Sequence, residues 1–155
     1  MITRSSGVYS RESAGNLVED TIRVLVADSS EAMREGIRHM LGGDDSIKVV
    51  GEARDGKEAL DLVVKLAPDI VILDGSLRGT DCTKVISYIK ECAPQVGVIV
   101  LNDEQNFLVP AIENGASGFL TGDVGRTDLI GAIRIVHLWR MVLFQQGSRF
   151  TLVKL

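Results

Sequence analysis

The sequence predicts an open, doubly wound α/β protein built on a parallel sheet. Short runs of consecutive apolar residues alternate along the chain with amphipathic helical segments, and parallel strands need such crossover helices between them. The connecting segments are short and carry Gly, Pro, Asp or Asn, which is typical of turns. The chain has 155 residues, 45% of them hydrophobic and 25% charged, which suits one globular domain with a substantial core.

Five strands and five helices are expected after a polar arm. Residues 1–20 show no apolar period, so we expect a flexible arm there and an organised domain over 21–140. Strands are predicted at 22–28, 47–53, 69–74, 96–101 and 118–121. Helices are predicted at 31–41, 57–66, 81–92, 107–113 and 127–139.

The first helix has clear start and stop signals. Ser29 or Ser30 can cap its beginning, and Gly42 with Gly43 can end it. Its expected buried face consists of Met33, Ile37, Met40 and Leu41. Because the strand at 47–53 alternates more than the one at 22–28, we expect it nearer the sheet edge.

The later elements are also bounded by turn residues. Asp55 and Gly56 lead into the second helix, which Pro68 ends, and Pro94 closes the third helix in the same way. The strands at 69–74 and 96–101 are continuously apolar, as expected of strands buried on both faces.

Two aspartates follow neighbouring strands of the predicted sheet. The expected strand order is the flavodoxin-like 2-1-3-4-5, with its switch point between the first and third strands. Asp28 and Asp74 end these two strands. Ligands of open parallel sheets bind at this edge, so we expect the two carboxylates to share one acidic pocket.

Residues 141–155, after the last helix, are expected to be a tail or linker remnant. A hairpin is possible there, since two apolar runs flank Gln145–Ser148. The last helix and this tail carry more apolar residues than one buried stripe needs, which suggests a partner or homodimer surface. These residues are Ile133, Ile135, Val136, Leu138, Trp139, Val142, Leu143 and Phe144.

Composition disfavours several classes of function. The net charge is -4 and no basic stripe is present, so we expect no nucleic-acid binding by this chain alone. No signal peptide or run of about 20 apolar residues is visible, which predicts a cytoplasmic protein without membrane contact. Cys82 and Cys92 fall in one predicted helix, too far apart for a disulfide, and are expected to be reduced thiols.

Several blocks of this sequence together resemble the receiver domains of bacterial response regulators, particularly the NarL/LuxR-type branch. The resemblance covers about residues 22–140 and depends on the order of the blocks. They are Arg23–Asp28, Met33–Ile37, Gly51–Leu60, Pro68–Asp74 and Gly115–Leu120.

The resemblance implies a set of site residues. Asp74 matches the carboxylate that accepts a phosphoryl group from a sensor histidine kinase, and Phe119 matches an aromatic residue that switches rotamer. Mg²⁺ would be held by Asp28, Asp74 and the backbone carbonyl of Ser76, a donor set of hard oxygen atoms that suits this cation.

The sequence departs from the family pattern at three positions around this site and at one position in the loop after Asp74. Ser29 replaces a second acid that helps to attract the metal. Asn102 replaces a Thr or Ser at the end of the fourth strand, although its amide can still donate a hydrogen bond. Gly122 replaces the lysine that pairs with the phosphoryl group, which is the most damaging change, because a pre-positioned cation stabilises developing charge. Arg78 replaces a common proline and could supply charge from another direction.

The expected function is therefore that of an atypical receiver, or pseudo-receiver, in phosphorelay signalling. It would be a non-enzymatic phosphoprotein that acts through protein contacts, with Asp74 as the candidate phosphoacceptor. One alternative is a conventional Mg²⁺-dependent phospho-Asp switch taken from a DNA-binding transcription regulator. Less favoured are a flavodoxin-like carrier, which Asp28 disfavours, and an Asp-nucleophile phosphatase, which would need a second acid at Ser76.

Overall fold

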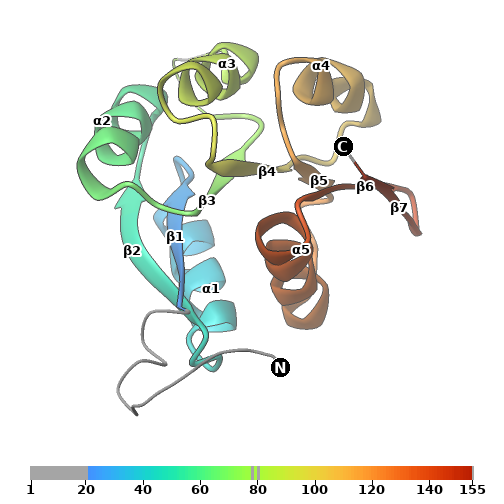
Figure 1. Cartoon of the computed structure of the whole chain (residues 1–155), viewed down its shortest axis with the longest axis horizontal. Helices are drawn as coiled ribbons and strands as arrows, with labels where there is room; N and C mark the ends of the chain where they lie inside the picture. The colour runs from blue at the N-terminus through green and yellow to red at the C-terminus, as the bar shows by residue number, and fades with distance from the viewer. Residues whose placement is uncertain (1–20, 78, 80, 155) are drawn as a thin grey trace, which may run out of the picture.

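The computed structural model describes residues 21–77, 79 and 81–154. The expected arm at 1–20 and Arg78 lie outside the described residues. One sheet of seven strands runs in the order β2-β1-β3-β4-β5-β6-β7 (Figure 1). The strands are β1 (Ile22–Ala27), β2 (Ile47–Ala53), β3 (Ile70–Asp74), β4 (Gly97–Leu101), β5 (Gly118–Leu120), β6 (Met141–Gln146) and β7 (Arg149–Lys154).

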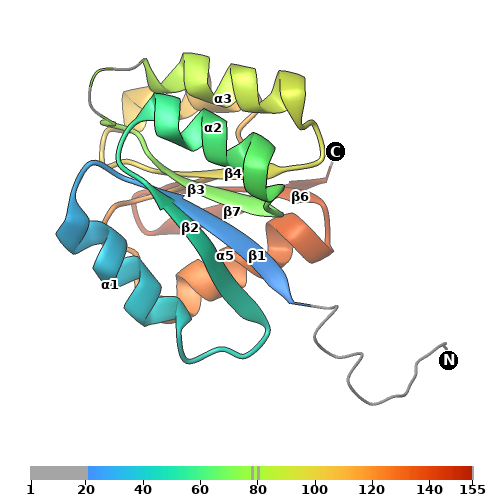
Figure 2. The same cartoon turned by 90° about the vertical axis from the view of Figure 1, so that its left-hand side faces the viewer.

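Helices cover both faces of the sheet. They are α1 (Glu31–Leu41), α2 (Gly56–Leu66), α3 (Cys82–Cys92), α4 (Leu108–Glu113), which the 3₁₀ turn η2 (Gln105–Phe107) precedes, and α5 (Arg126–Leu138). Figure 2 shows α2 and α3 on one side of the sheet and α1 and α5 on the other. The flavodoxin-like class is confirmed, with the five expected strands in the order 2-1-3-4-5.

The helix starts depend on local side-chain caps. Ser30, rather than Ser29, caps α1, and its Oγ accepts the N–H of Met33 at 3.2 Å. Asp55 accepts the N–H of Glu58 at 2.9 Å, which starts α2. Such caps satisfy backbone donors that the first helical turn leaves without partners.

The core consists of two layers because β3 and β4 are buried on both faces. Alternate strand residues point to opposite layers. Val71 and Leu73 face α2, α3 and α4, whereas Ile70 and Ile72 face α1 and α5. This double burial explains why the strands are continuously apolar.

The buried face of α1 differs from the expected one. Ile37 and Leu41 are buried, but Met33 is 40% exposed and Arg34 is only 8% exposed. Arg34 Nη1 donates to the carbonyl of Asp28 at 2.7 Å, and its Nε donates to Glu52 Oε1 at 3.1 Å. Arg34, which is not on the expected buried face, is thus held by a backbone carbonyl in the loop that follows β1 and by a carboxylate on β2.

Residues after α5 extend the sheet by two strands beyond the expected five. β6 lies parallel to β5, pairing Gly118 with Leu143 and Phe119 with Phe144, and β7 lies antiparallel to β6. Much of the apolar excess at the end of the chain is therefore buried inside the protein: Ile133, Val136, Val142 and Leu143. Leu138 and Trp139 remain exposed, with Trp139 at 69%.

Candidate functional site

A recess of about 840 Å³ lies at the carboxyl ends of the central strands. The loops that follow β1, β3, β4 and β5 surround it, because parallel strands deliver their carboxyl ends to one edge. We call it the acidic pocket. It is lined by Asp28, Ser30, Met33, Asp74, Gly75, Ser76, Leu101, Asn102, Asp103, Glu104, Phe107, Gly122 and Asp123.

Asp28 and Asp74 lie together in this pocket, as the sequence predicts. The Asp28 side chain is 5% exposed, and its Oδ1 accepts the backbone N–H of Ser30 at 2.8 Å. Burial raises the pKa of the Asp28 carboxyl above its usual value, and the nearby negative charge of Asp74 raises it further. A cation bound between the two carboxylates would offset both costs.

Asp74 is half-buried and is oriented by the residue two positions after it. Its Oδ1 accepts the backbone N–H of Ser76 at 3.0 Å and the Ser76 hydroxyl at 2.9 Å. The sequence suggested only a carbonyl role for Ser76, but its side chain also helps to hold Asp74. An acid followed two residues later by Ser is a common local turn, so this signal was readable in the sequence.

Asn102 lies against the backbone of Gly75. Its Oδ1 accepts the N–H of Glu104 at 2.7 Å. A β-carbon at position 75 would lie 2.8 Å from the Asn102 Cβ and even closer to its amide nitrogen, so glycine is needed there for Asn102 to line the pocket. Ser29 is half-buried between the pocket residues Asp28 and Ser30.

Gly122 stands where the family resemblance implies a lysine, and an acidic residue contacts it. The Gly122 N–H donates to Asp103 Oδ1 at 2.8 Å. The Thr121 hydroxyl lies 2.7 Å from Asp123 Oδ1. Asp103 and Asp123 both line the pocket, and we call these two residues the acidic rim. Their positions after strands were visible in the sequence, but their convergence was not.

Carboxylates dominate the charge of the pocket. None of the lining residues in the described part of the chain is Lys, Arg or His. Five of them are acidic: Asp28, Asp74, Asp103, Glu104 and Asp123. Such a site attracts a cation and repels a free phosphate group.

Phe119 lies in the core and not in the pocket. It is fully buried, and its ring centroid is 6.5 Å from that of Phe107. Phe107 lines the pocket, whereas Phe119 is not among the lining residues. The residue that the resemblance gives as a switch is thus buried beside a residue of the pocket wall.

The donor set of the pocket fits Mg²⁺ in a limited way. Within the described ranges there is no cluster of three or more His, Cys, Asp or Glu side chains arranged to hold a metal ion. Mg²⁺ often binds through only one or two carboxylates and keeps several waters. Asp28 and Asp74, with the Ser76 carbonyl, would be the ligands, and the bound ion would neutralise charge on an incoming phosphoryl group.

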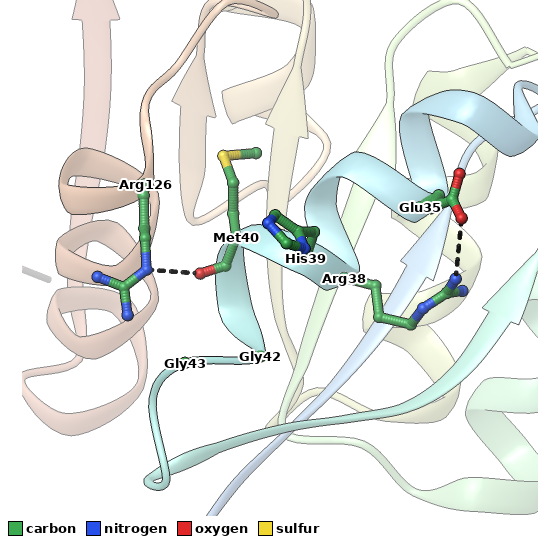
Figure 3. Close-up of a pocket in the computed structure, with 7 residues that line it drawn as sticks. All are labelled: Glu35, Arg38, His39, Met40, Gly42, Gly43 and Arg126. Carbon is green, nitrogen blue, oxygen red and sulfur yellow. Dashed lines mark hydrogen bonds and ion pairs between the residues drawn. The ribbon is translucent and has the colours of Figure 1, made fainter.

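A second recess, of about 740 Å³, lies between the end of α1 and the start of α5 (Figure 3). Arg126 Nε donates to the Met40 carbonyl at 2.9 Å across this recess. Arg38 forms ion pairs with Glu35 and Glu52. Because these groups already have partners, the recess is less suited to chemistry than the acidic pocket.

In the described part of the chain, no helix has the length and apolar character needed to cross a membrane.

Comparison with known proteins gives one consistent result. Residues 24–134 match the family model described as "Response regulator receiver domain".

Two curated relatives and one solved structure illustrate the match. "Probable transcriptional regulatory protein NarL" of Mycobacterium tuberculosis is 35% identical over 116 residues, which cover 74% of this chain and 54% of that protein. "Response regulator GacA" of Pseudomonas viridiflava is 32% identical, covering 74% and 55%. The solved signal receiver domain of the M. tuberculosis NarL has 34% identity and a TM-score of 0.70, covering 74% of this chain and 94% of that one. The chain spans about half the length of the curated relatives it matches.

Proposed function

This chain belongs to the response regulator receiver family of two-component signalling, and from that premise we propose that it is an atypical receiver. Asp74 is the candidate phosphoacceptor in this proposal. The protein acts as a signalling module through its contacts with other proteins and not as an enzyme that turns over a substrate.

The contact between Asp103 and Gly122 carries the proposal. A phosphoryl group on Asp74 would enter a pocket whose rim holds the carboxylates of Asp103 and Asp123. Like charges that share a partly desolvated pocket repel each other more strongly than they do in bulk water. The missing cation would have stabilised charge in the transition state, commonly by a few kcal/mol, so we expect phosphorylation to be slow.

Three features retain part of the ordinary chemistry. Asp28 and Asp74 can still hold Mg²⁺, and the amide of Asn102 lies in the pocket, where it can donate to a phosphoryl oxygen. Ser76 keeps the Asp74 carboxylate oriented. The pocket is therefore weakened for phosphoryl transfer without losing its acceptor.

The proposed partners are a sensor histidine kinase or another signalling protein, and a second copy of this chain. Leu138 and Trp139 at the end of α5 remain available for a homodimer contact, and their exposure supports this part of the proposal. We place the protein in the cytoplasm, where such kinases deliver their phosphoryl groups.

A conventional Mg²⁺-dependent phospho-Asp switch is the second candidate. The convergence of Asp28 and Asp74 favours it. Two of the curated relatives carry names of transcriptional or response regulators. In this case the chain would be the receiver part of a DNA-binding transcription regulator.

Phosphorylation by a small donor separates the two candidates. The purified protein is incubated with Mg²⁺ and acetyl phosphate, and its intact mass is followed with time beside an Asp74→Asn control. We expect slow, incomplete addition of one phosphoryl group that the control lacks. Rapid and complete conversion would favour the conventional switch, whereas addition that persists in the control would remove Asp74 as the acceptor.

A further inference from the structure

One side chain joins the β6–β7 hairpin to the rim of the acidic pocket. Gln145 Oε1 accepts the backbone N–H of Thr121 at 3.0 Å, and Gln145 Nε2 donates to the carbonyl of Gly147 at 3.0 Å. The amide thus bridges the hairpin turn and the loop that follows β5. Because 24 residues separate Gln145 from Thr121, this bridge exists only while the hairpin lies against β5.

The loop that Gln145 holds also presents the acidic rim. The Thr121 Oγ lies 2.7 Å from Asp123 Oδ1 and 3.1 Å from Gln145 Oε1. A hydroxyl has one proton, so the shorter distance assigns it to Asp123. Gln145 then holds the loop through the Thr121 N–H, while the next N–H, that of Gly122, holds Asp103.

The hairpin is attached in a way that permits release. β6 pairs with β5 at two positions, through Leu143 and Phe144, and the Leu143 N–H donates to the Ser117 carbonyl at 2.9 Å, whereas every residue of β7 is exposed. The buried anchors of β6 are Val142 and Leu143. Elements with few buried contacts open at lower free energy than the core does.

We infer that Gln145 is a positioning residue for the acidic rim, and that docking of the hairpin on β5 sets the geometry of residues 121–123. Release of the hairpin frees this loop and lets Asp123 turn away from the pocket. Cation binding and hairpin docking then favour each other, because any coupling between two sites is reciprocal. This ion coupling rests on the proposed function, whereas the positioning role does not.

Amide hydrogen exchange measured by NMR tests the positioning role. The chain offers a matched control, since Gln146 follows Gln145 and lies exposed at the hairpin tip. In Gln145→Ala we expect the Thr121 amide to exchange about tenfold faster or more, and in Gln146→Ala we expect no change. The amide of Ile72, buried in β3, serves as a reference for global opening.

Two exchange results would overturn the inference. One is an equal Thr121 rate in the wild type and both variants. The other is a Gln145→Ala variant in which Ile72 accelerates as much as Thr121, because the effect would then be global and not confined to the loop.

A second variant and a cation titration test the coupling. Thr121→Val loses the hydroxyl that holds Asp123. The backbone N–H at position 121 can still donate to Gln145, so we expect it to stay protected from exchange. We expect both Thr121→Val and Gln145→Ala to bind Mg²⁺ about threefold more weakly or worse, since an acidic rim attracts cations. Equal affinities would overturn the coupling. A wild type that binds no Mg²⁺ would overturn the ion part of the proposed function, and the exchange rates would still decide the positioning role.

Discussion

The backbone N–H of Gly122 donates a hydrogen bond to Oδ1 of Asp103 at 2.8 Å, so an acid meets the end of β5. A β-carbon at position 122 would lie 3.3 Å from the same oxygen, which leaves room for a side chain only after a small shift of Asp103. In the proposed function, this pair of residues is the reason why the pocket keeps a candidate phosphoacceptor and is still a poor site for a phosphoryl group.

Gly122→Lys should therefore speed phosphorylation. The new ammonium group would pair with Asp103 and present positive charge to a phosphoryl group on Asp74. We expect the rate of mass gain from acetyl phosphate to rise by about tenfold or more, because pre-positioned charge contributes a few kcal/mol. Gly125→Lys is the matched control, since position 125 opens into free space and does not line the pocket. A rate that stays at the wild-type level would mean that the missing cation does not limit the reaction.

Asp28→Asn should stabilise the protein at neutral pH and weaken Mg²⁺ binding. The substitution removes a buried charge beside Asp74, and the amide oxygen can still accept the Ser30 N–H. We expect a gain of about 1 kcal/mol in the free energy of unfolding. Urea denaturation at pH 7, with and without Mg²⁺, checks both effects.

The same substitution has a defined pH dependence. The raised pKa of Asp28 means that the folded wild type binds its proton more readily than the unfolded chain does. Wild-type stability therefore rises as the pH falls through the folded-state pKa toward the ordinary value of 3.8. The stability that Asp28→Asn gains over the wild type should therefore shrink as the pH falls through that interval. A gain that grows on acidification would contradict burial as the cause of the raised pKa.

The two cysteines should differ sharply in reactivity. Burial, with the nearby charges of Asp74 and Asp81, raises the pKa of the Cys82 thiol to about 12, so almost no thiolate forms at pH 8. Cys92 is exposed. We expect iodoacetamide to label Cys92 alone in the folded protein and both residues in urea, as read by peptide mass mapping. Fast labelling of Cys82 under native conditions would show that the loop beside Asp74 opens readily.

Arg34 should matter more for stability than its neighbour on the next helical turn. Arg34→Met leaves the Asp28 carbonyl and part of Glu52 without their donor, at a cost of about 2 kcal/mol. Arg38→Met removes a partly exposed ion pair with Glu52 and should cost less than about 1 kcal/mol. Chemical denaturation of the two variants gives the comparison, and equal losses would argue against the buried role of Arg34.

Much of the fold was readable from local patterns. The strands and helices from Ile22 to Leu138 lie within a residue or two of the predicted ranges, because apolar periodicity and caps such as Asp55 act over a few residues. The meeting of Asp28 and Asp74 also followed from the sequence, since the strand order of a doubly wound sheet brings those two strand ends together.

Other features depended on partners far away in the sequence. Periodicity placed Met33 on the buried face of the first helix and did not include Arg34, but Met33 is 40% exposed, whereas Arg34 is buried and donates to the carbonyl of Asp28. The apolar residues after α5 suggested a surface for a partner, yet Val142 and Leu143 are buried in a sixth strand that pairs with β5. A strand's own residues do not specify which free sheet edge it will join.

The sequence by itself determined the class of fold, the candidate acceptor Asp74 and the presence of Gly122 where the family resemblance implies a lysine, because each depends on residue type at a position along one strand or its end. Only the tertiary structure decided that Asp103 meets Gly122 and that Gln145 bridges the hairpin to Thr121. Both contacts join segments 19 or more residues apart. They form only after the strands have paired, so no local pattern of apolar or turn residues encodes them.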